Sequence, residues 1–175
     1  MAVETLRTRT HELWTERHPD LDTSPMEVVA QVKRITSVMD LVVEPIYQKA
    51  GVTSAEVELL VPLRHAEQPL TAIRLAELLG MTRAGVSKTL ARMEKRNLIV
   101  RVINPADRRS ALISVTERGQ TVIDEVFPRE LEAHGRMLAG LGAERRAVLD
   151  SLARLAESME SRLSSAVGEQ GSPDS

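Results

Sequence analysis

The 175-residue sequence contains no cysteine and very few aromatic residues. Without cysteine, the chain can form neither disulfide bonds nor a thiol-based redox sensor. Trp14, Tyr47 and Phe127 are its only aromatic residues, which argues against a protein that stacks single-stranded bases on aromatic rings. There is no run of 18 apolar residues and no signal-peptide pattern, so we expect a cytoplasmic protein without a membrane partner.

The sequence also lacks the short motifs that carry catalysis. We find no G-x-S-x-G, no phosphate-binding loop and no cysteine nucleophile, so we expect neither an enzyme nor a bound cofactor. The four histidines are scattered. His11 and His18 lie two turns apart and could share a helix face, but we interpret them as ordinary exposed histidines rather than metal ligands.

Residues 70–119 predict a helix-turn-helix followed by a hairpin. Thr71 can cap a helix that runs to residue 79, and Gly80 then provides the turn. Thr82 can cap a second helix that runs to about residue 96. One face of this second helix is apolar at the spacing of a buried stripe, through Val86, Leu90 and Met93.

The other face of the second helix carries hydrogen-bond donors and small side chains, with no acidic residue. A helix that enters the major groove of DNA requires this composition, because carboxylates would meet phosphates there. We predict DNA contacts from Thr82, Arg83, Ala84, Ser87, Lys88 and Arg92.

Two β-branched runs, residues 98–103 and 111–115, flank a turn rich in Asn, Pro and Asp. They predict a hairpin whose tip carries Asp107, Arg108 and Arg109, which we add to the predicted DNA contacts. The expected fold is therefore mainly α with a small β-hairpin wing, a winged helix-turn-helix joined to a helical dimerisation region.

This stretch resembles the MarR family of dimeric transcriptional regulators. The resemblance rests on LAELLG at 75–80, VSK at 86–88, DRR at 107–109 and LISVTERG at 112–119, and it extends over roughly residues 24–163. It implies a homodimer on double-stranded DNA, with Arg109 in the minor groove. It also implies a supporting role for Asp107, which would orient the tip by pairing with a nearby cation such as Arg92.

Charge is unevenly distributed along the chain. Residues 71–118 hold ten basic and four acidic residues, a net of +6, whereas the remainder holds 13 basic and 21 acidic residues, a net of −8. Solvated helices are often rich in lysine and arginine. The absence of acids on the predicted groove-facing side nevertheless favours a DNA-binding module on an acidic scaffold.

Helices are predicted on both sides of this module. S-P-M-E at 24–27 and T-S-A-E at 53–56 are candidate capping boxes, and a break is expected near Gly140 and Gly142. The apolar surface of these helices exceeds what one module can cover, which favours a two-fold dimer. We predict dimerisation helices at 1–50 and 119–163, a DNA-binding lobe at 51–118 and a disordered tail at 164–175.

The N-terminal extension is similar to the urate-responsive subgroup of the family. That resemblance implies an effector site at Trp14, Glu58, Thr89 and Arg101, although the subgroup has aspartate in place of Glu58 and arginine in place of Thr89. A pocket for another small anion, with Arg101 as its counter-charge, is one interpretation, and Trp14 as a packing residue is the other.

The leading hypothesis for the function of the chain is a homodimeric repressor relieved by a small molecule and bound to a pseudo-palindromic operator. The alternative is a winged-helix protein-interaction module that no longer binds DNA.

Overall fold

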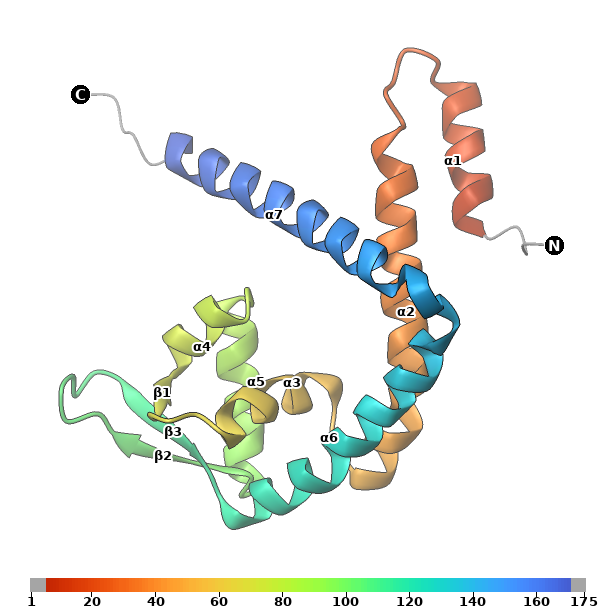
Figure 1. The fold of residues 1–175 in the computed structure, drawn as a ribbon. Coiled ribbons are helices and arrows are strands. Elements are labelled where there is room, and N and C mark those ends of the chain that lie inside the picture. Colours follow the sequence, from red (N-terminus) through yellow and green to blue (C-terminus); the bar gives the residue numbers. More distant parts are fainter. Residues whose placement is uncertain (1–5, 171–175) are drawn as a thin grey trace, which may run out of the picture. The chain divides into compact units, whose positions relative to one another are not determined.

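The computed structural model describes residues 6–170, which are mainly helical with one small sheet (Figure 1). They fall into two compact units, residues 1–134 and residues 135–175. The elements in chain order are α1 (Leu6–Arg17), α2 (Pro25–Ala50), α3 (Ser54–Arg64), β1 (Leu70–Thr71), α4 (Ala72–Leu78), α5 (Arg83–Lys95), β2 (Ile99–Ile103), β3 (Ala111–Val115), α6 (Glu117–Leu138), the 3₁₀ helix η1 (Ala139–Glu144) and α7 (Arg145–Gln170).

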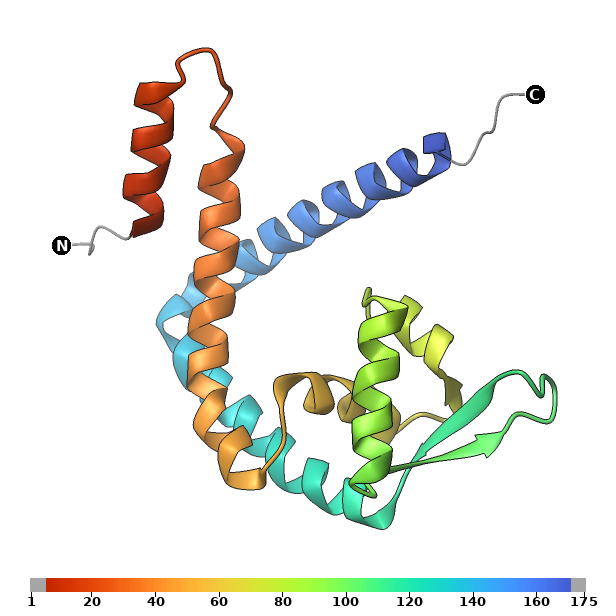
Figure 2. The ribbon, with the colours of Figure 1, turned by 180° about the vertical axis from the view of Figure 1, so that it is seen from behind.

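In the first unit, α1 runs beside the first half of α2 as a helical hairpin (Figure 2). The capping box predicted at Ser24 is wrong. Ser24 already has helical angles (φ −55°, ψ −34°), so its hydroxyl makes no capping hydrogen bond, and its amide instead donates to Asp22 Oδ1 at 3.0 Å. The second box is confirmed, since Thr53 and Glu56 exchange reciprocal hydrogen bonds at the start of α3.

The winged helix-turn-helix is confirmed. Thr71 and Thr82 cap α4 and α5 through their side chains, and Gly80 adopts the left-handed conformation (φ 61°) that the turn requires. The sheet has one more strand than predicted: β1 pairs antiparallel with β3, giving the order β1-β3-β2. In the hairpin itself, Ile99 lies opposite Val115 and Ile103 opposite Ala111.

One apolar core holds this lobe together and joins it to α2 and α6. The predicted buried stripe of α5 is confirmed, because Val86, Leu90 and Met93 are fully buried. They pack in one cluster with apolar side chains of every neighbouring element, among them Val43, Tyr47, Leu59, Leu60, Leu75, Ile99, Ile113, Ile123 and Val126. The exposed face of α5 therefore rests on a scaffold that apolar burial stabilises.

The start of α6 is fixed to the turn before the hairpin. Thr116 caps α6 by accepting from the Gly119 amide at 3.1 Å, and its hydroxyl donates to the Asn97 carbonyl at 2.7 Å. The Thr116 amide also donates to the Leu98 carbonyl at 3.1 Å. The T-x-x-G sequence thus ties the wing, through residues 97–98, to the first turn of α6.

The second unit begins within α6 and contains η1 and α7. The predicted break is confirmed, because Gly142 leaves the helical region with φ 46° inside η1. The disorder predicted from residue 164 is wrong as far as residue 170, since α7 continues to Gln170. Ser, Ala, Glu and Gln in this stretch accept helical geometry at small cost. Residues 171–175, the rest of the predicted tail, lie outside the described residues.

Candidate nucleic-acid interface

The exposed side of α5 is the first part of the candidate interface. Thr82, whose hydroxyl accepts from the Gly85 amide at 3.2 Å, sets the start of the helix. Thr89 turns inward with the apolar residues and is 8% exposed. The exposed residues from 82 to 91 are Thr82, Arg83, Ala84, Ser87, Lys88 and Ala91, and all but Ala91 are residues for which the sequence predicts DNA contacts. Nearer the end of the helix, Arg92, Glu94 and Lys95 are exposed as well.

Arg83 differs from the other outward residues because an acid lies near it. Its guanidinium is 4.0 Å from Glu77 of α4, at the outer limit of an ion pair, and 73% of its side chain is exposed. Glu77 also pairs with Arg74 at 3.3 Å. Arg83 is therefore loosely held and accessible to a phosphate or a base edge.

Arg92 lies at the other end of α5 and has a different environment. Its Nε donates to Glu56 Oε1 at 3.1 Å, and its Nη2 donates to Thr53 Oγ1 at 2.9 Å. The pairing of Asp107 with Arg92 implied by the family resemblance is therefore wrong, because both guanidinium contacts of Arg92 go to α3 and its cap. Sequence spacing gave no signal for a partner 36 residues away.

The tip of the wing is built by its own polar side chains. Asp107 Oδ1 accepts from the Arg109 amide at 3.0 Å, and the Asp107 carbonyl accepts from the Ser110 amide at 3.0 Å. Asn104 Oδ1 accepts from the Ala106 amide, and Asn104 Nδ2 donates to Ser110 Oγ, both at 3.0 Å. Asp107 thus orients the tip through local turn chemistry rather than through a cation on α5.

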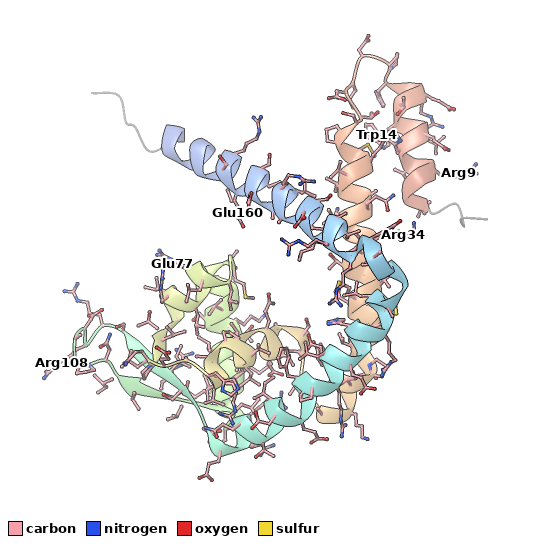
Figure 3. All side chains as sticks on the ribbon, in the orientation of Figure 1. Arg9, Trp14, Arg34, Glu77, Arg108 and Glu160 are labelled. Carbon is pink, nitrogen blue, oxygen red and sulfur yellow. The ribbon has the colours of Figure 1, made fainter. Side chains whose placement is uncertain are left out.

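Arg108 and Arg109 are exposed at this tip, and Arg108 points away from the body of the lobe (Figure 3). Within residues 6–170, neither guanidinium takes part in a hydrogen bond or ion pair given by the structure. Two cations on a turn that does not need their side chains are available to bind an external anion, such as a DNA phosphate.

The structure separates the residues predicted for the effector site. Trp14 of α1 is 46% exposed, stacks on His18 with ring centroids 4.8 Å apart, and lines a surface cavity formed by α1 and His18, the residue that follows it. Arg101 of β2 is held by Glu94 of α5, with Nε 3.1 Å from the carboxylate. Glu58 is exposed on α3. The Glu94 partner of Arg101 is a further feature that the sequence did not reveal.

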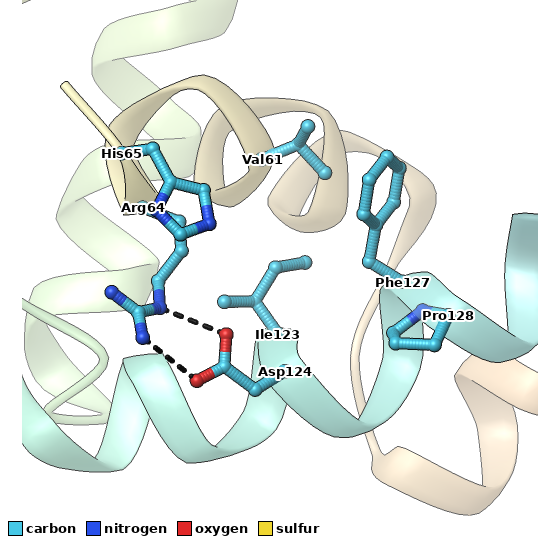
Figure 4. A pocket seen from close by; sticks show the side chains of 7 residues that line it. All are labelled: Val61, Arg64, His65, Ile123, Asp124, Phe127 and Pro128. Atoms are coloured by element: carbon cyan, nitrogen blue, oxygen red, sulfur yellow. Dashed lines mark hydrogen bonds and ion pairs between the residues drawn. The ribbon is translucent and has the colours of Figure 1, made fainter.

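A cavity of about 220 Å³ lies between α3 and α6 (Figure 4). Its lining is apolar apart from one side, and consists of Val61, Arg64, His65, Ile123, Asp124, Phe127 and Pro128. Arg64 and Asp124 close that side with two parallel hydrogen bonds of 2.8 and 2.9 Å. The hydrogen bond from Arg64 lowers the pKa of Asp124, so the pair is ionised at neutral pH.

Among residues 6–170, no group of three or more His, Cys, Asp or Glu side chains is arranged to hold a metal ion. None of the helices over the same residues combines the length and apolarity needed to span a membrane.

Comparisons with known proteins agree with this geometry. Residues 50–110 match the model of the MarR family. The chain is 25% identical over 141 residues to the transcriptional regulator PecS of Dickeya dadantii, covering 79% of this chain and 85% of PecS. It spans about half the length of several other curated HTH-type regulators that it matches.

Solved structures of the same fold include complexes with DNA and with a ligand. The S. aureus MepR–DNA complex superposes with a TM-score of 0.68 and 22% identity, covering 76% of this chain and 96% of MepR. CouR of Rhodococcus jostii RHA1, bound to p-coumaroyl-CoA, superposes with a TM-score of 0.62 and 20% identity, covering 75% and 90% of the two chains. At these identities the likeness concerns the fold.

Proposed function

We propose that this chain, whose residues 50–110 match the model of the MarR family, is a homodimeric transcriptional repressor of a pseudo-palindromic operator. The observation that carries the proposal is the outward face of α5, which presents donors and small side chains and has no acidic residue in its first turn. Thr82, Arg83, Ala84, Ser87 and Lys88 form the surface proposed to enter the major groove. Arg92 is not part of this surface, because its guanidinium contacts Glu56 and Thr53.

The wing supports the same proposal. In winged helices docked through α5, the hairpin lies over the neighbouring minor groove. Arg109 is proposed to enter that groove, where arginine is favoured by the negative potential of A·T-rich sequences. Arg108 then has a phosphate as its partner, and Asp107 keeps the tip in shape through the Arg109 amide.

The dimer is supported by apolar surface that a single chain leaves exposed. Six apolar side chains of α2 are at least 39% exposed: Val28, Val29, Val32, Ile35, Val38 and Leu41. In the second unit, α7 likewise exposes Leu149, Leu152, Met159 and Leu163. So many exposed apolar side chains along these helices favour a protein partner, and a two-fold partner would cover them while supplying a second α5. The segments 1–50 and 119–163 are the proposed dimerisation regions.

The proposed effector is a small organic anion that releases the operator. Arg101 is its candidate counter-charge, Trp14 and Glu58 are further candidates at separate places on the chain, and the cavity between α3 and α6 offers an apolar location. Arg101 has a direct connection to DNA binding, because its partner Glu94 lies on α5. An anion that replaces Glu94 at Arg101 would change a contact of the recognition helix itself.

The proposal is tested by selecting duplexes from a random pool with the purified full-length chain and measuring affinity by fluorescence anisotropy. We expect two half-sites about 10 bp apart, bound by a dimer, with affinity that falls steeply as salt rises. Sedimentation on the same samples reports the oligomeric state. A chain that stays monomeric, or that shows no preference for any selected duplex over a scrambled one, would favour the alternative hypothesis, a winged-helix protein-interaction module that does not bind DNA.

A further inference from the structure

A fully buried carboxylate lies behind the recognition helix. Glu56, in the first turn of α3, has 0% of its side chain exposed. An unpaired buried charge would be strongly destabilising, so the folded chain must supply partners. Glu56 Oε2 accepts from the Thr53 amide at 2.9 Å, Oε1 accepts from Arg92 Nε at 3.1 Å, and Arg96 Nη1 donates to both oxygens at 2.8 and 2.9 Å.

The two arginines also reach the turn that precedes α3. Arg92 Nη2 donates to Thr53 Oγ1 at 2.9 Å, and Arg96 Nη2 donates to the carbonyl of Gly51. Gly51 ends α2 in the left-handed conformation, with φ 65°. These five residues, named here the Glu56 clamp, connect the last turn of α5 to the end of α2 and the start of α3.

The clamp is held by charge as well as by hydrogen bonds. Burial alone raises the pKa of Glu56, but the hydrogen bonds from Thr53 and Arg96 and the charges of Arg96 and Arg92 outweigh it and hold the pKa below its ordinary value. The carboxylate is therefore ionised at neutral pH, and its bonds to the two guanidinium groups are the strong, directional kind.

Directional bonds at this place complement the apolar core. The contacts of Val86, Leu90 and Met93 hold the middle of α5 against the lobe, and the Glu56 clamp adds directional bonds at the last turn of the helix. A helix of 13 residues is about 20 Å long, so a tilt of about 5° at one end moves the other end by roughly 2 Å. The end that would move carries the residues proposed to enter the major groove.

We propose that Glu56 is a positioning residue for DNA recognition, and that Arg92 acts through the Glu56 clamp rather than by touching DNA. Glu56 has no exposed surface, so any effect of its substitution on DNA binding must pass through other residues. The inference rests on the proposed function and adds a device that sets the orientation of α5.

The test is a double-mutant cycle in the full-length chain between Glu56→Gln, which removes the charge and keeps the shape, and Arg92→Ala. Affinity for the selected operator and for a scrambled duplex is measured by anisotropy across a range of salt concentrations, with circular dichroism and melting curves as folding controls. We expect each single substitution to lower the operator-to-scrambled affinity ratio by about tenfold, and the double variant to lose little more than the worse single variant. The slope of log affinity against log salt should stay at the wild-type value.

Lys88→Ala is the matched control, because Lys88 is exposed on the same helix. Its loss should reduce the salt slope if it binds phosphate, and it should add to the effect of Glu56→Gln. Arg92→Lys supplies a second variant in case Glu56→Gln does not fold. Lysine keeps a charge for a phosphate but cannot bridge Glu56 and Thr53, so the clamp predicts nearly the loss seen for Arg92→Ala.

Two results would overturn the inference while leaving the proposed function intact. One is an Arg92→Ala effect that adds fully to that of Glu56→Gln and lowers the salt slope by about 1, as for a direct phosphate contact. The other is near wild-type discrimination in Arg92→Lys. Absence of operator preference in the wild-type chain would instead overturn the proposed function, and with it the recognition role of the clamp.

Discussion

Replacing Gly119 with alanine probes the junction between the wing and α6. Gly119 is buried in the first turn of α6, against the backbone of residue 98. An added Cβ would lie well inside van der Waals contact of the Leu98 carbonyl oxygen, 3.0 Å from the Leu98 carbonyl carbon and 2.6 Å from Val115 Cγ1. The carbonyl cannot turn aside freely, because it accepts the Thr116 amide at 3.1 Å.

The magnitude follows from two opposing terms. Overpacking against backbone costs about 1–3 kcal/mol, and the fixed carbonyl places this site at about 3 kcal/mol. Alanine regains about 1 kcal/mol of helix propensity over glycine. The net loss is therefore about 2 kcal/mol of unfolding free energy, which for a chain of this size lowers the melting temperature by about 4–8 °C.

Gly135 supplies a matched control in the same helix. Within its own chain, a Cβ at Gly135 meets no atom within 4 Å, and the φ of Gly135 is not positive, so Gly135→Ala keeps only the propensity gain and should raise the melting temperature by about 2–4 °C. Both variants are melted by circular dichroism at one protein concentration, since a dimer melts in a concentration-dependent way. A Gly119→Ala protein that melts with the wild type would show that the contact with Leu98 does not constrain the fold.

Two further predictions concern ion pairs and cations. Arg109→Ala should weaken operator binding by about 1–3 kcal/mol without changing the melting curve, and more on sites with A·T-rich flanks than with G·C-rich flanks. Equal operator affinity of the wild type and Arg109→Ala at moderate salt would show that the Arg109 side chain is solvated and does not contact DNA. Arg64 holds the pKa of Asp124 below its ordinary value of 3.8, so the pair contributes stability above that value, which is lost as pH falls through the lowered pKa. Asp124→Asn should therefore melt below the wild type at neutral pH and together with it in strong acid; a difference that persists in acid would exclude the ion pair as its source.

The features that could be predicted from the sequence are those with a local signal. The caps at Thr71 and Thr82 and the turn at Gly80 depend on residues within a few positions of each other, so their residue types identify them. The buried stripe of α5 follows from helical periodicity in the same way. Ser24 is the exception. Its residue type is typical of a helix cap, but it adopts helical angles, and its amide donates to the side chain of Asp22.

The features that could not be predicted depend on partners distant in the sequence. β1 has two residues, too few for an alternating pattern, and exists only because it pairs with β3. The ion pair of Arg64 and Asp124 joins residues 60 positions apart. Arg92 lies on the outside of α5 by helical phase, so sequence reasoning assigned it to DNA. Its partner Glu56 reaches it only in the folded lobe.

Internal pairing also changes the meaning of the +6 charge of residues 71–118. Arg92 and Arg96 are committed to Glu56, a residue outside that segment, and Arg101 is committed to Glu94. Formal charge therefore overstates the number of cations that can neutralise phosphates. The strength of the salt dependence should follow the unpaired cations at the DNA surface rather than the charge count.

Those cations are few. Within the described residues of the proposed DNA surface, Lys88, Arg108 and Arg109 take part in no ion pair given by the structure, and Arg83 has only the 4.0 Å contact with Glu77. Three or four cations in each lobe make six to eight in a dimer, which corresponds to a slope of log affinity against log salt of about −5 to −7. All ten basic residues of each lobe would give a slope more than twice as steep. Release of Arg92, Arg96 and Arg101 in both lobes would steepen the slope by about 5, so a slope of about −11 to −13 would mean that the clamp and the Glu94 pair open when the protein binds DNA.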